Sequence, residues 1–313
     1  MRPAGLLVMA YGTPASPDAV ADYYTHIRHG RQPTDDQLAD LVRRYDAIGG
    51  ISPLATRTEA QRRALADALE RRRPATFAVE LGQKHAAPFV EDGMAALADA
   101  GASTVIGLVL APHFSRGSIG EYHERAATAA AAHDISYRGI DSWHLVPAYL
   151  DFMAHAVRDA RTELPEKHKV LFTAHSLPER VLDGDPYPDQ LRQSAEAIAE
   201  RVGLLPWPDW ALAWQSAGRT PEPWRGPDIL HVIRDLAATG RSAGILVVPQ
   251  GFTSDHLEVL YDLDIEAASV AHEHGLAFAR TRSLNDDATV MDALAGVVNA
   301  VLVGEPERRA PHA

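Results

Sequence analysis

One histidine and a row of carboxylates are the side chains best suited to chemistry. His175 ends the apolar run KVLFTAH, where a buried strand would meet a turn. Residues 255–266, DHLEVLYDLDIE, hold five acidic residues and no Lys or Arg. Among them Glu258, Asp262 and Glu266 recur every fourth residue, which stacks carboxylates on one face of a helix. An imidazole with a carboxylate suits proton transfer or the binding of Fe²⁺.

Both features also have a structural interpretation. A strand-end histidine is commonly a core residue satisfied by backbone groups, and an acidic helix face commonly lies in water. The functional interpretation is a track of carboxylates that holds a divalent cation loosely and passes it inward. The sequence has no HExxH, no 2-His-1-carboxylate spacing and no EF-hand pattern, so a fixed structural metal is not expected. It also has no GxSxG motif, and neither GxGxxG nor GxxxxGK[ST] follows a strand.

A local concentration of arginines predicts an anion site in residues 23–54. Arginine binds carboxylates bidentately, tyrosine and serine add donors, and the glycines of GGISP would let a loop approach a ligand closely. The alternative is an ordinary helical excursion with a solvated basic face. The donors concentrated here are Arg28, Arg31, Arg43, Arg44, Tyr45 and Ser52.

The elements that must position these groups alternate along the chain. Short apolar runs are separated by longer amphipathic segments, which indicates an α/β fold with parallel sheets covered on both faces. The expected strands are 5–11, 77–81, 104–112, 169–175, 210–215 and 243–249. The clearest expected helices are 58–73, 88–101 and 188–203.

A weak internal repeat predicts two similar halves with a boundary near residue 150. LLVMAYGTP (6–14) and VLFTAHSLP (170–178) align without a gap and place Tyr11 opposite His175, and VLAPHFS corresponds to LVVPQGFTS later in each half. In open α/β sheets, ligands bind at the carboxyl ends of strands. We therefore expect Tyr11 and His175 to line a cleft between the halves, with the acidic segment beginning in one of its loops.

Composition limits the classes of function. The chain has 313 residues, 46% of them hydrophobic and 23% charged, which is typical of a soluble globular protein. Its formal charge of −12 argues against binding nucleic acid or anionic lipid and would suit a cationic substrate. The absence of cysteine excludes disulfides and cysteine-ligated iron–sulfur clusters. With no apolar run of about 18 residues, we expect no membrane span and a cytoplasmic location.

The sequence resembles the ferrochelatase family, and most closely its soluble, cysteine-free bacterial branch, which inserts iron into coproporphyrin III. The likeness covers roughly residues 5–302. The strings that carry it are LLVMAYGTP, YYTHIRHGR, YDAIGGISPL, LAPHFS, TAHSLP, DPYPDQL, WQSAGRTPEPWRGPD and GFTSDHLEVLYDLDIE.

The resemblance implies a fold of two Rossmann-like halves that enclose a porphyrin cleft and bind no nucleotide. The first half would span 1–150 and the second 151–286. A C-terminal helix at about 287–303 would pack back on the first half, and 304–313 would form a frayed tail.

The resemblance also implies roles for single residues. His175 matches the catalytic histidine and Glu258 its partner carboxylate, both as Fe²⁺ ligands, and Asp262 and Glu266 match an acidic line from Glu258 to the surface. Tyr11 matches a tyrosine that faces the metal from the other side of the ring. The positions that match groups near the substrate's propionates are Arg28, Arg44, Tyr45, Ser52 and Tyr122. Lys84 and His85 match the family's KH pair, and His29 stands where relatives often carry a second arginine.

The implied reaction replaces two pyrrole N–H protons with Fe²⁺, a substrate, and needs no permanent cofactor. The implied partners are the porphyrin, Fe²⁺ and, transiently, neighbouring enzymes of haem synthesis, with the protein a monomer. The alternatives are a chelatase for protoporphyrin IX or another metal such as Co²⁺ or Ni²⁺, a non-catalytic tetrapyrrole carrier, and a binding protein for a small anion. Either His175 or Glu258 could deliver the metal or abstract the protons.

Overall fold

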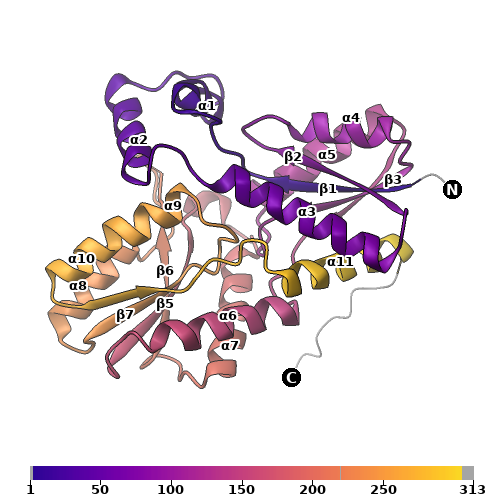
Figure 1. Cartoon of the computed structure of the whole chain (residues 1–313). Coiled ribbons are helices and arrows are strands. Elements are labelled where there is room, and N and C mark those ends of the chain that lie inside the picture. The colour runs from indigo at the N-terminus through magenta and orange to yellow at the C-terminus, as the bar shows by residue number, and fades with distance from the viewer. Residues whose placement is uncertain (1–2, 219, 305–313) are drawn as a thin grey trace.

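Two four-stranded parallel sheets organise the chain (Figure 1). The computed structural model describes residues 3–218 and 220–304. The first sheet has the order β2 (Phe77–Gln83), β1 (Ala4–Ala10), β3 (Thr104–Val109), β4 (Ser136–Ile140). The second repeats this arrangement as β6 (Trp210–Gln215), β5 (His168–His175), β7 (Gly244–Val248), β8 (Ala277–Arg280). The two-half α/β fold predicted from the sequence is confirmed.

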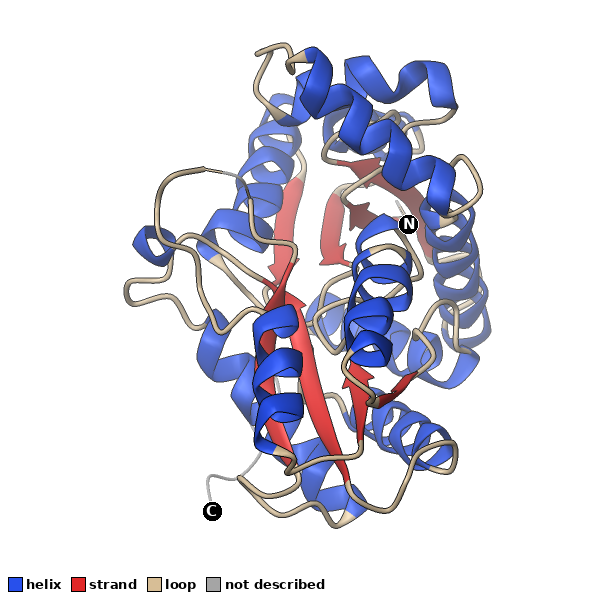
Figure 2. Ribbon diagram, turned by 90° about the vertical axis from the view of Figure 1, so that its left-hand side faces the viewer, coloured by secondary structure: helices blue, strands red, loops and turns tan. Residues whose placement is uncertain are grey.

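Helices surround both sheets (Figure 2). In the first half they are α1 (Val20–Ile27), α2 (Asp35–Ala47), α3 (Leu54–Arg72), α4 (Val90–Asp99) and α5 (Glu121–Ala132). Further along the chain are α6 (Pro147–Arg161), α7 (Tyr187–Val202), α8 (Ile229–Thr239), α9 (Leu257–Leu260), α10 (Ala268–Glu273) and α11 (Ala288–Val303). Two π-helical turns, Arg116–Gly120 and Asp262–Ala267, directly precede α5 and α10.

A shared core joins the two sheets. Successive side chains of a strand point to opposite faces, so Leu6 of β1 enters this core while Leu7 packs beneath α4 and α5. Phe172 of β5 enters the shared core from the second sheet, together with residues of α3, α6, α7 and α11. The outer face of the second sheet is covered by α8 and the segment around α10. Burial on both faces explains why the central strands are apolar throughout.

Two strands of the structure are missing from the sequence prediction. β4 and β8 lie at the edges of their sheets and are only four to five residues long. Most of their residues are half-buried or exposed. Neither strand therefore forms the continuous apolar run by which the other six strands are recognised.

The last helix returns to the first half of the chain. α11 packs against α3 (Figure 1), where Arg72 Nη2 lies 2.6 Å from Asp292 Oδ2. Arg138 of β4 donates from Nη1 to the carbonyl of Val301 over 2.9 Å. The expected tail begins at Gly304, and its residues 305–313 lie outside the described part of the chain. Within the described ranges, no helix has both the length and the apolar character needed to cross a bilayer.

Candidate active site

His175 and Glu258 form an ion pair at the carboxyl end of β5. His175 is the last residue of this strand, and its Nε2 lies 3.5 Å from Glu258 Oε1 at the start of α9. The other ring nitrogen, Nδ1, lies 2.5 Å from the carbonyl of Ser176. Because a carbonyl can only accept, Nδ1 carries a proton and Nε2 is directed to the carboxylate.

The pair is charged on both partners at neutral pH. Burial acts to lower the pKa of His175, but the carboxylate of Glu258 outweighs it and raises this pKa to about 9. Burial acts to raise the pKa of Glu258, but His175 and then His256 hold it well below its ordinary value. The resting site is therefore an imidazolium beside a carboxylate.

A second histidine contacts Glu258. His256 Nε2 lies 3.7 Å from Oε2, the oxygen that faces away from His175. The Nδ1 of His256 lies 3.0 Å from the carbonyl of Ser254, which fixes the ring. His256 was not predicted as a site residue, because only the acidic residues of this segment stood out in the sequence. A histidine two positions before a candidate ligand was the available signal.

The acidic segment continues from Glu258 through a π-helical turn. The amide of Glu266 donates to the carbonyl of Tyr261 over 2.9 Å, the wider hydrogen bond of a π-helix. Asp262 is 7% exposed, whereas Glu266 is half-buried. Burial and then the charge of Glu258 raise the pKa of Asp262 to about 6. Within the row, the pKa of Glu258 is therefore well below its ordinary value, whereas that of Asp262 is raised to about 6.

Positive side chains from distant segments lie among these carboxylates. Arg44 Nη1 of α2 is 3.2 Å from Asp262 Oδ1, and the Arg44 guanidinium lies over the ring of Tyr261. Arg280 of β8 lies 2.5 Å from Asp264. Arginines of the protein, and not a passing divalent cation alone, therefore offset the charge of this acidic stretch. The partners are far away in sequence, so local charge counting could not find them.

Tyr11 lies directly after β1, in the position that His175 takes on β5. Its residue surface is 44% exposed, and its ring centroid is 4.6 Å from that of His85. Burial, followed by the charge of Glu258, raises the pKa of Tyr11. The field of Glu258 therefore reaches Tyr11, which places the two strand ends in one electrostatic environment.

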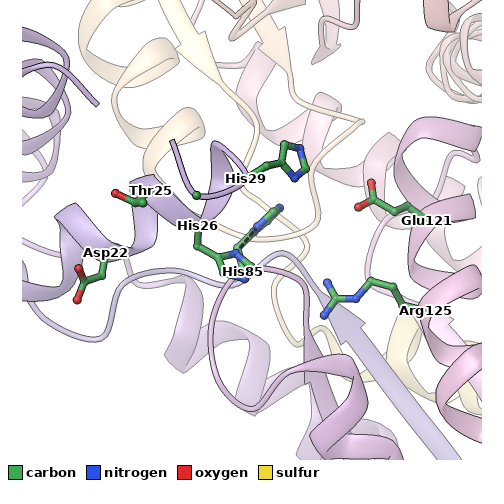
Figure 3. Close-up of a pocket in the computed structure, with 8 residues that line it drawn as sticks. Asp22, Thr25, His26, His29, His85, Glu121 and Arg125 are labelled. Atoms are coloured by element: carbon green, nitrogen blue, oxygen red, sulfur yellow. Dashed lines mark hydrogen bonds between the residues drawn. The ribbon is translucent and has the colours of Figure 1, made fainter. Parts of the chain in front are cut away.

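A pocket of about 460 Å³ opens beside Tyr11, at the end of β2 (Figure 3). His85 forms part of its wall, and its Nδ1 lies 3.0 Å from Nδ1 of His26. Burial, followed by the charge of Lys84, lowers the pKa of His85 to about 3, so this ring is neutral at pH 7. The lining residues are Asp22, Thr25, His26, His29, Gly30, His85, Glu121 and Arg125.

The expected propionate donors have different surroundings. Arg28 ends α1, donates from Nε to the carbonyl of Arg31 and lies over the ring of Tyr24. Ser52 is buried and accepts from the amide of Leu54 at the start of α3.

Tyr45 and Tyr122 are each 4% exposed, and Arg44 is bound to Asp262. Of the expected donors, Arg28 therefore contacts residues of its own segment, whereas Arg44 is paired with a carboxylate of the acidic row.

The described residues hold no group of three or more His, Cys, Asp or Glu side chains arranged to bind a metal ion. His175 and Glu258 would supply two ligands at most, which leaves the other coordination positions of a metal free. Such an open arrangement suits an ion that is passed on.

The fold is similar to that of two proteins described as enzymes of sirohaem biosynthesis or as binding iron. SirB from Bacillus subtilis with Fe³⁺ superposes with a TM-score of 0.57 at 13% identity, covering 98% of both chains. CbiX, described as the terminal enzyme of sirohaem biosynthesis in denitrifying bacteria, gives a TM-score of 0.54 at 13% identity, over 95% of this chain and 98% of its own. At this level of identity the similarity concerns the fold alone.

Sequence similarity is much closer to another group of proteins. The chain is 44% identical over 304 residues to the coproporphyrin III ferrochelatase of Geobacillus kaustophilus (strain HTA426), covering 95% of each chain. It is 42% identical over 301 residues to that of Bacillus subtilis (strain 168), covering 94% of this chain and 96% of the relative. The sequence profile described as Ferrochelatase matches residues 3–302. The chain therefore belongs to the ferrochelatase family.

Proposed function

We propose that this protein inserts Fe²⁺ into coproporphyrin III to give iron coproporphyrin. The observation that carries the proposal is the His175–Glu258 pair, 3.5 Å apart at a strand end, in the electrostatic environment of Tyr11. Relatives named coproporphyrin III ferrochelatases, 41–45% identical over nearly the whole chain, support this choice of substrate.

The reaction exchanges two pyrrole N–H protons for one Fe²⁺ ion. A flat macrocycle holds its lone pairs in the ring plane, where an incoming hydrated metal reaches them poorly. A site that binds a bent macrocycle better than a flat one lowers this barrier by differential binding. The protein has to present the metal on one side of the ring and remove two protons.

The charge state of the pair sets the order of events. An imidazolium cannot bind a metal or accept a proton, so His175 must first lose its own proton. A dication held by Glu258 would lower the pKa of His175 and drive that loss. Asp262, with a pKa of about 6, is suited to take up and release protons along the row.

Four propionates distinguish coproporphyrin from protoporphyrin, which has two. Arg28 directly follows α1, and its neighbour His29 lines the pocket beside His85 together with Arg125. Charge-assisted contacts of this kind favour the substrate with more carboxylates. Arg44, Lys84 and Arg125 contribute less to this preference, because the carboxylates of Asp262, Glu121 and Glu91 already engage them.

A metal-insertion assay tests the proposal. Under anaerobic conditions with Fe²⁺, we expect higher kcat/KM for coproporphyrin III than for protoporphyrin IX, with His175→Ala as the blank for uncatalysed insertion. Faster insertion into protoporphyrin IX, or a preference for Co²⁺ or Ni²⁺ over Fe²⁺, would replace the substrate assignment. Tight porphyrin binding without insertion would indicate a carrier.

We further propose that the protein acts as a monomer in the cytoplasm, with Fe²⁺ as substrate and no permanent cofactor. Its structural units would be residues 1–150 with the helix at 287–303, and residues 151–286. Sedimentation at working concentration and metal analysis of the purified protein test these points. A stable dimer or a stoichiometric bound metal would contradict them.

A further inference from the structure

Gln215 lies beside His175 and is fixed to the segment that follows it. It is the last residue of β6, is paired in register with His175 of β5, and is 1% exposed. Its backbone carbonyl accepts from the amide of Ser176 over 2.8 Å. The backbone of Gln215 therefore fixes the chain where it leaves the catalytic strand.

The side chain of Gln215 reaches the other member of the pair. Its Nε2 donates to the backbone carbonyl of Glu258 over 3.0 Å. Since that carbonyl can only accept, the amide must present its nitrogen to Glu258. One buried residue thus bonds both to the neighbour of His175 and to Glu258, two groups that come from different elements.

The next residue binds the next carboxylate of the row. Ser216 has a left-handed backbone with φ of 58°, a conformation that residues other than glycine rarely adopt. From there its Oγ donates to Asp262 Oδ2 over 2.5 Å. Gln215 and Ser216 together hold the acidic segment at both Glu258 and Asp262.

The equivalent strand of the first half behaves differently. β2 also ends in a buried glutamine, Gln83, which is paired in register with Ala10. Its Nε2 donates to the carbonyl of Ala87 over 2.7 Å, within the loop that follows its own strand. A buried glutamine at the end of a strand can thus be satisfied locally, although Gln83 is offset by one residue from Gln215, because its strand partner is Ala10 and not Tyr11. The hydrogen bond from Gln215 to Glu258 of α9 is therefore not needed to end the strand, so it has another role.

We propose that Gln215 is a positioning residue for metal insertion, which holds the Glu258 carboxylate within reach of His175 Nε2. The expected effect of Gln215 on catalysis rests on the proposed function. Its effect on the position of Glu258 relative to His175 does not, because that is a matter of geometry. Gln215 acts through Glu258 and is not assigned any contact with the metal or the ring.

Gln215→Met tests the proposal, because it keeps the length of the side chain and removes the amide donor. We expect kcat for iron insertion to fall about tenfold or more, with the KM for coproporphyrin III within about twofold of wild type. A crystal structure of the variant should show His175 Nε2 and Glu258 Oε1 farther apart than 3.5 Å. Should this variant not fold, Gln215→Asn keeps a buried amide but is one methylene too short to reach Glu258, and the same results are expected.

Gln61→Met is the matched control. Gln61 is 0% exposed, donates from Nε2 to the carbonyl of Asn285 over 2.9 Å and accepts at Oε1 from Ser254 Oγ over 3.1 Å, so Gln61→Met loses a buried hydrogen bond of the same kind and one more. We expect its kcat to stay within about twofold of wild type. Equal losses of kcat in both variants, or an unchanged His175–Glu258 separation in Gln215→Met, would overturn the proposal. If the wild type inserts no iron, the proposed function fails, while the crystal structures still decide whether Gln215 positions Glu258.

Discussion

The carboxyl ends of β1 and β5 occupy the same place in their sheets and carry opposite kinds of chemistry. At the end of β1, Tyr11 lies against His85, whose lowered pKa of about 3 keeps its ring neutral. At the end of β5, His175 is an imidazolium paired with Glu258, with a pKa raised to about 9. The histidine at one strand end is neutral, and the histidine at the other belongs to a zwitterionic pair.

The difference originates in the segments that follow neighbouring strands. Lys84 lies next to His85 after β2, and its positive charge disfavours a second positive charge on the His85 ring. After β7 the chain supplies Glu258 and Asp262, whose carboxylates favour a positive charge on His175. The repeated fold thus provides two equivalent positions, and the loops decide which one can handle a cation and protons. We infer that the β5 end carries out the metal chemistry and that the β1 end holds the ring.

The largest expected effect is the loss of insertion in His175→Ala. The imidazole serves the chemistry, whereas affinity for the porphyrin comes from the surrounding surface, so we expect kcat to fall on the order of 100-fold or more with coproporphyrin binding retained. His168→Ala, at the opposite end of β5, should insert iron at the wild-type rate. Fluorescence titration and anaerobic insertion assays measure the two quantities. Normal turnover in His175→Ala would remove this residue from the mechanism.

The carboxylates should differ in importance along the row. Glu258→Gln should reduce insertion far more than Asp262→Asn, and Glu266→Gln least, because only Glu258 contacts His175. Glu266 acts through water-exposed electrostatics, so its small effect should vanish as salt is added. Initial rates at low and high ionic strength test this order. Equal losses at all three positions would disprove a gradient.

The two strand ends should respond to pH in opposite directions. The raised pKa of His175 contributes stability that is fully present below its unfolded value of about 6.5 and is lost as the pH rises through about 9. Wild type should therefore lose more unfolding free energy than Glu258→Gln between pH 6.5 and 9. The lowered pKa of His85 has the opposite sign, so wild type should lose more than His85→Gln as the pH falls from 6.5 towards 3. Urea unfolding at a series of pH values measures both, and parallel curves would contradict the assigned charges.

The smallest effect on rate is expected for Tyr11→Phe. A phenolic oxygen suits ferric iron in the product better than incoming Fe²⁺, which is softer. Loss of the hydroxyl should therefore change the absorption spectrum of bound iron coproporphyrin and leave insertion within a fewfold of wild type. If Tyr11 only packs the end of β1, the spectra of the two product complexes will overlay and the variant will merely be less stable.

Much of the fold could be predicted because the inner strands are buried on both faces. β1 and β7 are buried along their whole length, which forces the apolar runs by which they were recognised. The edge strands β4 and β8 carry no such pattern. The π-helical turn at Asp262–Ala267 was missed as well, because its residues keep the four-residue spacing of an ordinary amphipathic helix.

The site was predictable where chemistry and position coincide in one residue. His175 and Glu258 could be singled out because a strand end and an acidic run are visible in the sequence, and their roles are still predictions. The role of Arg44 at a propionate stays a prediction, whereas its ion pair with Asp262 was not expected, since α2 and the acidic segment meet only in the folded chain. Gln215 has no charge and no spacing signal, so only its hydrogen bonds bring it to notice.

The structure of a coproporphyrin III complex tests the central claim most directly. We expect the porphyrin ring to lie between the ends of β1 and β5. The Tyr11 hydroxyl should face one side of the ring, and His175 Nε2 with Glu258 the other. A ring bound elsewhere, or Tyr11 and His175 on the same face, would contradict the division between a strand end that handles the metal and one that holds the ring.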